Sequence, residues 1–136
     1  MIHVSAAIIC NELNEIIICQ RGPVGSCALL WEFPGGKQEP NETSDQCLVR
    51  ECREELSIDI EIIDLFAETT YTYPECEIVF SFFNAHIIHG TPKCIVHNEI
   101  KWVNLKSIGK YGFCPADIEI VHKLKLQSQT GPKINY

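Results

Sequence analysis

The sequence predicts an α/β fold built from mixed strands and two helices. Short runs rich in Ile, Val, Ala and Phe, separated by Gly, Pro and Asn turns, indicate strands along most of the chain. Two stretches, residues 43–56 and 115–126, contain no Gly or Pro after their first residue and indicate helices. With 136 residues, 46% of them hydrophobic and 21% charged, the chain is expected to form one globular domain over residues 1–136.

The strand patterns follow the chain in order. We expect strands at residues 4–10, 16–21, 58–73, 76–88 and 101–104. Residues 22–30 begin Gly-Pro and are expected to form a loop of the kind that folds over a ligand. Pro115 suits the first turn of the second helix, which is expected to end near Leu126. The tail, residues 128–136, is expected to be loose.

The first helix has the clearest local signals. Thr43 is followed three residues later by Gln46, the pattern of a capping box. At about 100° per residue, four apolar side chains share one stripe that can face a core. They are Leu48, Val49, Cys52 and Leu56.

Three carboxylates of this helix, Glu51, Glu54 and Glu55, are three or four residues apart and therefore cluster on a neighbouring face. Like charges at this spacing destabilise a helix unless a cation lies among them. Oxygen ligands suit a hard divalent cation such as Mg²⁺, which usually takes one or two carboxylates plus substrate phosphates. A solvated acidic face neutralised by Arg50 and Arg53 is the alternative, and the charges alone do not separate the two.

The spacing of these residues favours a metal site over a solvated acidic face. The stretch contains Gly36, five residues, Glu42, seven residues, and then Arg50-Glu51-Cys52-Arg53-Glu54-Glu55-Leu56-Ser57-Ile58. It resembles the Nudix box of the MutT/Nudix hydrolases, which has Gly where this chain has Ser57. The flanks also look MutT-like: Gln20-Arg21, residues 31–37, the Trp102 strand and Pro115-Ala116-Asp117. The resemblance covers roughly residues 3–126 and is closest to the CTP pyrophosphohydrolase and 8-oxo-dGTP diphosphatase branch.

The resemblance implies an α/β/α sandwich and a Mg²⁺-dependent hydrolase, with Mn²⁺ as a substitute metal. The implied reaction converts a (d)NTP, including modified or oxidised forms, to the monophosphate and pyrophosphate. Candidate substrates are CTP or dCTP-type nucleotides and 8-oxo-dGTP. A noncatalytic nucleotide sensor with the same fold stays open, as does a Nudix hydrolase acting on another nucleoside diphosphate derivative such as ADP-ribose.

The resemblance also implies roles for individual residues. Glu51, Glu54 and Glu55 are the expected metal ligands or general base, and the Gly35 carbonyl is a further expected ligand. Many relatives carry another carboxylate near the Trp102 strand, at a position occupied here by Val96. Glu99 is the candidate for that role and His97 a weaker one; an exposed carboxylate at the start of a strand is the alternative for Glu99.

Four residues are expected to contact the nucleotide: Arg21, Phe33, Lys37 and Asp117. Core packing is the alternative for Phe33, and solvation for Lys37. Asp117 corresponds to a position that is commonly Asn in guanine-oxidation enzymes and Asp in CTP-type relatives. Its carboxylate could accept a hydrogen bond from an exocyclic amine, or it could merely favour the dipole of the second helix.

Three other positions of the box are expected to be structural. Arg50 is expected to orient a glutamate, and Glu42 to shape the turn before the helix. Ser57 in place of Gly is expected to affect the helix C-terminus, at a cost of about 1 kcal/mol or less.

Net charge and cysteine usage indicate which partners and which cellular compartment to expect. The net charge of −7 argues against binding a nucleic-acid polymer, and the apolar runs are too short for a membrane span. The N-terminus lacks a signal-peptide pattern, so a cytoplasmic monomer or homodimer is expected. The eight cysteines include no C-x-x-C pair and favour reduced thiols over a disulfide scaffold or a zinc site.

Overall fold

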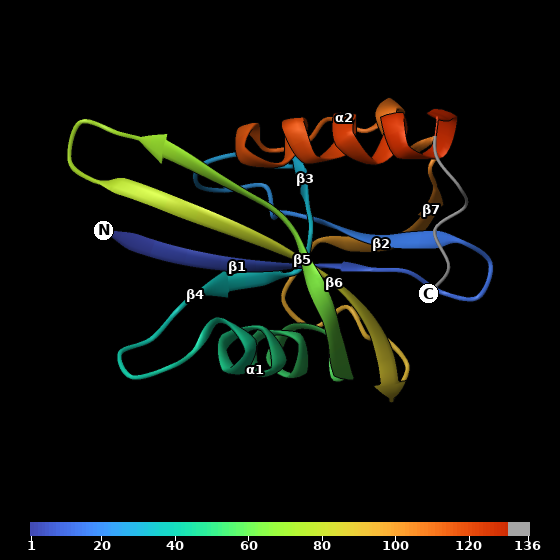
Figure 1. Cartoon of the computed structure of the whole chain (residues 1–136), viewed down its shortest axis with the longest axis horizontal. Coiled ribbons are helices and arrows are strands. Elements are labelled where there is room, and N and C mark those ends of the chain that lie inside the picture. The colour runs from blue at the N-terminus through green and yellow to red at the C-terminus, as the bar shows by residue number, and fades with distance from the viewer. Residues whose placement is uncertain (131–136) are drawn as a thin grey trace.

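Two β-sheets lie between two helices (Figure 1). The computed structural model describes the backbone of residues 1–130 and the side chains of residues 1–127. The four-stranded sheet has the order β4 (Gly35–Lys37), β1 (Ile2–Ile9), β6 (Glu77–His89), β5 (Asp59–Thr72). The three-stranded sheet has the order β3 (Trp31–Glu32), β2 (Glu15–Gln20), β7 (Glu99–Asn104). The helices are α1 (Ser44–Leu56), α2 (Pro115–Thr130) and the short 3₁₀ helix η1 (Ile108–Lys110).

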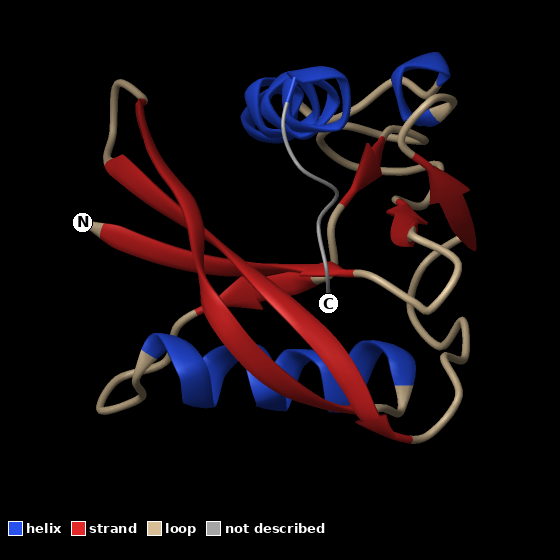
Figure 2. Ribbon diagram, turned by 45° about the vertical axis from the view of Figure 1, so that its right-hand side comes forward, coloured by secondary structure: helices blue, strands red, loops and turns tan. Residues whose placement is uncertain are grey.

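The layers confirm the predicted α/β/α sandwich with a mixed sheet. β1 runs parallel to β6 and antiparallel to β4, whereas β5 and β6 form a long antiparallel hairpin. Helix α1 packs on one side of the strands and α2 on the other, as both views show (Figures 1 and 2). Each helix covers its own apolar core. Leu48, Cys52 and Leu56 lie in the core under α1, and Ile120, Val121 and Leu124 in the core under α2.

Helix α1 begins and ends as its sequence predicts. Thr43 Oγ1 accepts the N–H of Gln46 at 3.1 Å, and Gln46 Oε1 accepts the N–H of Thr43 at 3.0 Å, which completes the capping box. Ser57 ends the helix in the left-handed region, with φ 59° and ψ 40°, and donates its N–H to the Arg53 carbonyl. Gly is the usual residue in this conformation, so the effect of Ser57 falls on the helix C-terminus.

The structure adds features that the sequence patterns did not predict. β3 and β4 are too short for periodicity to reveal, and Pro34 lies between them. Helix α2 continues to Thr130, beyond Leu126, because no Gly or Pro follows Pro115 before Gly131. The first three residues of the expected loose tail are therefore helical in backbone, while residues 131–136 lie outside the described residues.

Within the described chain, neither helix combines the length and apolar character that a membrane crossing needs.

Candidate active site

The site is built where β4, paired with β1, packs against the second half of α1. Gly35 has φ 153°, and a Cβ there would overlap the backbone of Ser5 on β1, so this position requires glycine. A Cβ on Gly36 would overlap the carboxylate of Glu51 instead. The two glycines therefore allow the α1 carboxylates to reach the backbone of β4.

Glu55 lies on the same side of α1 as Glu51. Its Oε1 accepts the N–H of Gly35 at 3.2 Å, so two glutamates of the helix contact consecutive glycines of β4. Burial raises the pKa of Glu55 to about 8, with further contributions from the negative charges of Glu51 and Glu32, whereas the Gly35 hydrogen bond opposes the shift. A carboxylate in this environment favours either a proton or a cation.

Arg50 organises the remaining carboxylates. Its guanidinium binds Glu42 through two bonds of 2.7 and 3.0 Å, and this pairing lowers the pKa of Glu42 to about 2. Arg50 Nη1 also lies 2.6 Å from Glu51 Oε1 and 3.3 Å from Glu54 Oε2. The geometry therefore agrees with the expected structural roles of Arg50 and Glu42.

A second group of polar residues joins β2, β3 and the start of α2. Arg21 Nη1 donates to Glu32 Oε1 at 3.1 Å, and His97 Nε2 lies 3.0 Å from Glu32 Oε2. The His97 side chain is 6% exposed, and its Nδ1 is buried without a hydrogen-bond partner among the described residues. Glu32 therefore binds the Arg21 guanidinium through one carboxylate oxygen and the His97 imidazole through the other.

Asp117 closes this second group from α2. The residue is 7% exposed, and its carboxylate accepts a hydrogen bond from the backbone of Phe33. Burial, followed by the charge of Glu32, raises the pKa of Asp117 to about 8 against the opposing effects of Phe33 and Arg21. A raised pKa favours the protonated form of Asp117 over the ionised carboxylate expected from the sequence. A protonated acid would gain less from the dipole of α2 than a carboxylate would.

Comparison with known proteins identifies the family. Residues 5–123 match the family model described as NUDIX domain. The chain belongs to the Nudix hydrolase family. The 8-oxo-dGTP diphosphatase of Escherichia coli is 34% identical over 124 residues, covering 91% of this chain and 96% of that protein. The CTP pyrophosphohydrolase of Escherichia coli is 36% identical over 121 residues, covering 89% of each chain.

Solved structures agree with this assignment. The solution structure of the E. coli ORF135 protein superposes with a TM-score of 0.84 at 33% identity, covering 98% of this chain and 95% of that one. A MutT structure from work on Aliivibrio salmonicida and Vibrio cholerae gives a TM-score of 0.79 at 30% identity, covering 93% and 97%. The similarity thus extends over nearly the whole of this Nudix hydrolase.

Nudix hydrolases generally depend on a divalent metal, and the donor set in this chain fits one. Glu51 and Glu55 lie against the backbone of Gly35 and Gly36. The pKa of Glu55 is raised mainly by burial and further by the charges of Glu51 and Glu32, and a cation beside it would favour its ionised form. No group of three His, Cys, Asp or Glu side chains in the described part of the chain is arranged to hold an ion alone.

Three other residues expected in the site of the Nudix hydrolase, Phe33, Lys37 and Glu99, form no side-chain hydrogen bond or ion pair with the α1 carboxylates, although the Lys37 carbonyl accepts from Arg50 at 3.2 Å. Phe33 is buried in the α2-side core, so its backbone, not an open ring face, meets Asp117. Lys37 is exposed at the end of β4. Glu99 is about half exposed and lies 3.7 Å from Lys101. Glu99 on β7 is paired with Gln20 on β2, and the adjacent pair, Cys19 and Ile100, faces the core under α1. Because successive side chains of a strand point to opposite faces, Glu99 faces away from α1.

Sequence reasoning assigned no role to Glu32 and left His97 as a minor candidate. No sequence signal singles out Glu32: its neighbours Trp31 and Phe33 face the α2-side core, whereas Glu32 pairs with Cys19 and points to the other face. Its partners come from residues 21 and 97, so no local pattern could identify them.

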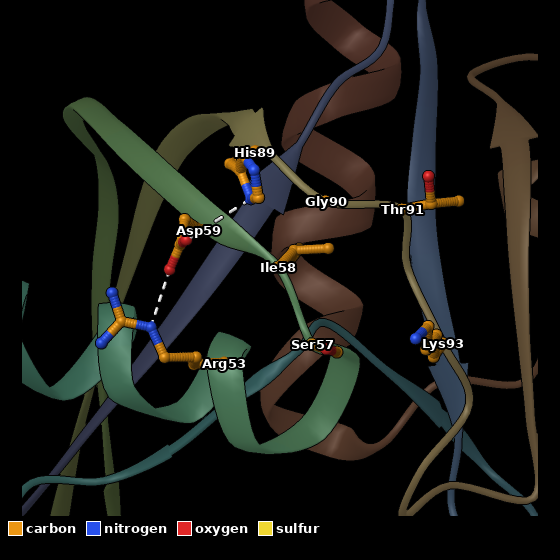
Figure 3. Close-up of a pocket in the computed structure, with 8 residues that line it drawn as sticks. All are labelled: Arg53, Ser57, Ile58, Asp59, His89, Gly90, Thr91 and Lys93. Carbon is orange, nitrogen blue, oxygen red and sulfur yellow. Dashed lines mark hydrogen bonds and ion pairs between the residues drawn. The ribbon is translucent and has the colours of Figure 1, made fainter.

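A separate pocket with a volume of about 350 Å³ lies at the C-terminal end of α1, beside Ser57 (Figure 3). Arg53 Nε pairs with Asp59 Oδ1 at 2.7 Å, and His89 lies 3.9 Å from the other oxygen of Asp59. Glu51, Glu54 and Glu55 do not line it. The pocket is therefore distinct from the candidate active site.

Gly36→Ala should reduce turnover roughly a hundredfold while leaving the melting temperature nearly unchanged. The added Cβ overlaps the end of the flexible Glu51 side chain, so the carboxylate moves and the backbone stays in place. Steady-state kinetics and thermal unfolding measure the two effects. Gly22→Ala, which meets open space, is the control and should match the wild type. Unchanged turnover in Gly36→Ala would contradict the placement of Glu51.

Asp117→Asn should flatten the pH dependence of stability. Since the pKa of Asp117 is about 8 when folded and ordinarily 3.8, the folded state holds a proton that the unfolded state releases between these values. The wild-type free energy of unfolding should therefore fall as pH rises from about 4 to 8, by up to about 1.4 kcal/mol per pH unit from this residue. Denaturation curves across this range measure the difference, and Glu119→Gln on the exposed face of α2 is the control. Parallel curves for wild type and Asp117→Asn would show that Asp117 is ionised.

Proposed function

We propose that this Nudix hydrolase is a Mg²⁺-dependent nucleoside triphosphate pyrophosphohydrolase, which converts a (d)NTP and water to the monophosphate and pyrophosphate. The observation that carries the proposal is the convergence of Glu51 and Glu55 on Gly35 and Gly36, with Glu54 held beside them by Arg50. The similarity to an 8-oxo-dGTP diphosphatase and a CTP pyrophosphohydrolase of Escherichia coli supports this reaction class.

In this proposal Glu51, Glu54, Glu55 and the Gly35 carbonyl hold the metal. When bound, Mg²⁺ supplies charge neutralisation for the phosphate oxygens and lowers the pKa of attacking water. One of the three glutamates accepts a proton from that water. The water oxygen attacks a phosphorus atom of the triphosphate, and pyrophosphate and the monophosphate are released. Arg50 keeps the carboxylates in place through Glu51 and Glu54.

The base side of the substrate is assigned to Asp117 and Arg21. A buried neutral acid donates one hydrogen bond and accepts another, which matches a base edge carrying an acceptor beside a donor. Cytosine and 8-oxoguanine both present such edges, and thymine does too. The choice of CTP or dCTP-type nucleotides and 8-oxo-dGTP as the proposed substrates therefore rests on the similarity to the two Escherichia coli relatives. The full chain is proposed to act as one domain, as a monomer or homodimer in the cytoplasm, where the nucleotide pool lies.

Glu54→Gln should lower turnover by roughly a hundredfold or more without unfolding the protein. The amide keeps the size of the side chain but loses the charge that binds metal or accepts a proton. Separate detection of pyrophosphate and orthophosphate, with Mg²⁺ and with EDTA, tests the reaction. The exposed Glu12→Gln is the control and should keep full activity.

Pyrophosphate release that requires Mg²⁺ supports the proposal. Orthophosphate alone, or full activity in EDTA, would contradict it. Nucleotide binding with no product from any (d)NTP or ADP-ribose would identify a noncatalytic sensor.

Asp117→Ala should lower the specificity constant for the best nucleotide roughly ten- to a hundredfold, because a buried polar contact is lost. Asp117→Asn should retain most of it at pH 7, since an amide both donates and accepts as the neutral acid does. Specificity constants for dCTP, 8-oxo-dGTP and dTTP measure the effect, with the exposed Glu119→Ala as control. If the ratios between the three specificity constants are the same in the wild type and in both Asp117 variants, residues other than Asp117 select the base.

A further inference from the structure

One buried side chain of the loop that joins β6 to β7 reaches the candidate nucleotide site. The His97 side chain is 6% exposed, whereas its neighbours Val96 and Asn98 are exposed, so the loop turns this residue inward. Its Nε2 lies 3.0 Å from Glu32 Oε2, and its Nδ1 is buried with no hydrogen-bond partner among the described residues. A buried polar atom without a partner is unfavourable for folding, so packing alone would favour an apolar side chain here. The bond to Glu32 is therefore the interaction that an imidazole adds at this position.

Main-chain and neighbouring contacts fix His97 beside β2 independently of its ring. Asn98 donates its N–H to Gln20 O at 2.9 Å and its side-chain amide to Gln20 Oε1 at 2.7 Å. The Cys94 thiol donates to the His97 carbonyl at 3.1 Å, which closes the end of the loop. Gln20 is the last residue of β2 and directly precedes Arg21. The fold thus holds His97 and Arg21 against the same end of one strand.

Glu32 links His97 to Arg21. Because a carboxylate only accepts, His97 Nε2 donates to one oxygen of Glu32 while Arg21 Nη1 donates to the other at 3.1 Å. The Arg21 side chain is 40% exposed, and an ion pair at such a site is weakly fixed on its own. A carboxylate held at one oxygen can still turn about its last bond, whereas a second bond to a buried imidazole stops that rotation. His97 therefore fixes the carboxylate that holds the guanidinium.

The guanidinium held in this way keeps one nitrogen available. Arg21 Nε donates to Ser26 O at 3.1 Å and Nη1 donates to Glu32, whereas Nη2 makes no hydrogen bond to any residue that the structure describes. Since the guanidinium is planar, fixing Nε and Nη1 also sets the direction of Nη2. Nη2 is therefore the donor that a bound nucleotide can meet.

We propose that His97 is a positioning residue for nucleotide binding, which acts through Glu32 to aim the Arg21 guanidinium at the substrate. His97 itself contacts no substrate atom and transfers no proton in this role, because its Nε2 is engaged by Glu32 and its Nδ1 is buried. The effect on nucleotide binding rests on the proposed function, which assigns Arg21 to the nucleotide. The effect on the orientation of Arg21 does not.

Steady-state kinetics on dCTP and 8-oxo-dGTP test the proposal. For the better substrate, His97→Leu should raise KM roughly tenfold and change kcat by less than about twofold, because only a binding contact is loosened. His97→Gln should restore most of KM, since its amide nitrogen reaches the position of Nε2. His97→Asn, an amide one methylene shorter, should behave like His97→Leu. His122→Gln, on the exposed face of α2, is the control and should match the wild type.

Thermal unfolding checks that each variant is folded, and the Asn and Gln variants carry the test if His97→Leu does not fold. An unchanged KM in both His97→Leu and His97→Asn would overturn the proposal. A fall in kcat as large as the rise in KM would instead assign His97 to the chemical step, which contradicts a positioning role in binding.

A double-mutant comparison shows whether His97 acts through Arg21. Once Arg21→Ala has raised KM, adding His97→Leu should leave KM unchanged, because no guanidinium remains to be aimed. If the two substitutions raise KM by independent factors, His97 acts by another route and the proposal is wrong.

The side-chain Nε–H signals of the three arginines, Arg21, Arg50 and Arg53, report the same arrangement without any nucleotide. In ¹H–¹⁵N spectra the Arg21 signal, identified by its loss in Arg21→Ala, should broaden or shift in His97→Leu and return in His97→Gln. The Arg50 and Arg53 signals should stay in place in both variants. An unchanged Arg21 signal in His97→Leu would refute the positioning of Arg21.

The two kinds of measurement separate this proposal from the proposed function. Inactivity on every nucleotide would contradict the proposed function, and the Arg21 signal would still decide whether His97 positions Arg21. A changed Arg21 signal with an unchanged KM would show that this arrangement does not serve nucleotide binding.

Discussion

The guanidinium of Arg50 is the interaction on which the acidic face of α1 depends. A helix carrying Glu51, Glu54 and Glu55 within five residues is destabilised by its own charges, and α1 must also press against β4. Arg50 binds Glu42 before the helix and Glu51 and Glu54 on it, so one planar cation fixes the turn and two of the three carboxylates. Lysine could not reproduce this fork, because its single ammonium cannot form parallel bonds to Glu42 while holding Glu51. Glu55 is left outside the network, and it is the glutamate whose pKa rises.

Glu32 couples the two halves of the site. It lies on β3, paired with Cys19 of β2, and its carboxylate is shared between Arg21 and His97. Its charge contributes to the raised pKa of Glu55 on the α1 side and of Asp117 on the α2 side. Through its charge, Glu32 would therefore make the proposed metal-binding carboxylates and the proposed base-binding acid depend on one another. The two-residue strand β3 positions Glu32 for this role.

The features that sequence predicted well are those set by local physics. The capping box, the apolar stripe of α1 and the clustering of its glutamates follow from spacing along one helix, and the structure confirms each of them. The left-handed C-cap at Ser57 is likewise a matter of neighbouring residues. By contrast, the burial of Asp117 depends on β3 and the adjoining core, and the partners of Glu32 come from residues 21 and 97. These contacts join distant parts of the chain, so no window of sequence contains them. The facing direction of Glu99 needed the register of β2 with β7, which spacing from Trp102 does not provide.

The raised pKa values of Glu55 and Asp117 share a physical origin that bears on function. Asp117 is buried and Glu55 is partly buried, and the negative charge of Glu32 contributes to the raised pKa of both. Arg50 pairs with neighbours of Glu55, and Arg21 pairs with Glu32 and only partly offsets the raised pKa of Asp117. Burial without a cationic partner is unfavourable for a structural carboxylate and is typical of functional sites, where a ligand completes the environment. For Glu55 a cation would offset both the burial of the carboxylate and the negative charges of Glu51 and Glu32. For Asp117 a hydrogen-bonding group would offset the burial that dominates its raised pKa. The proposed metal and nucleobase are groups whose chemistry fits these two environments.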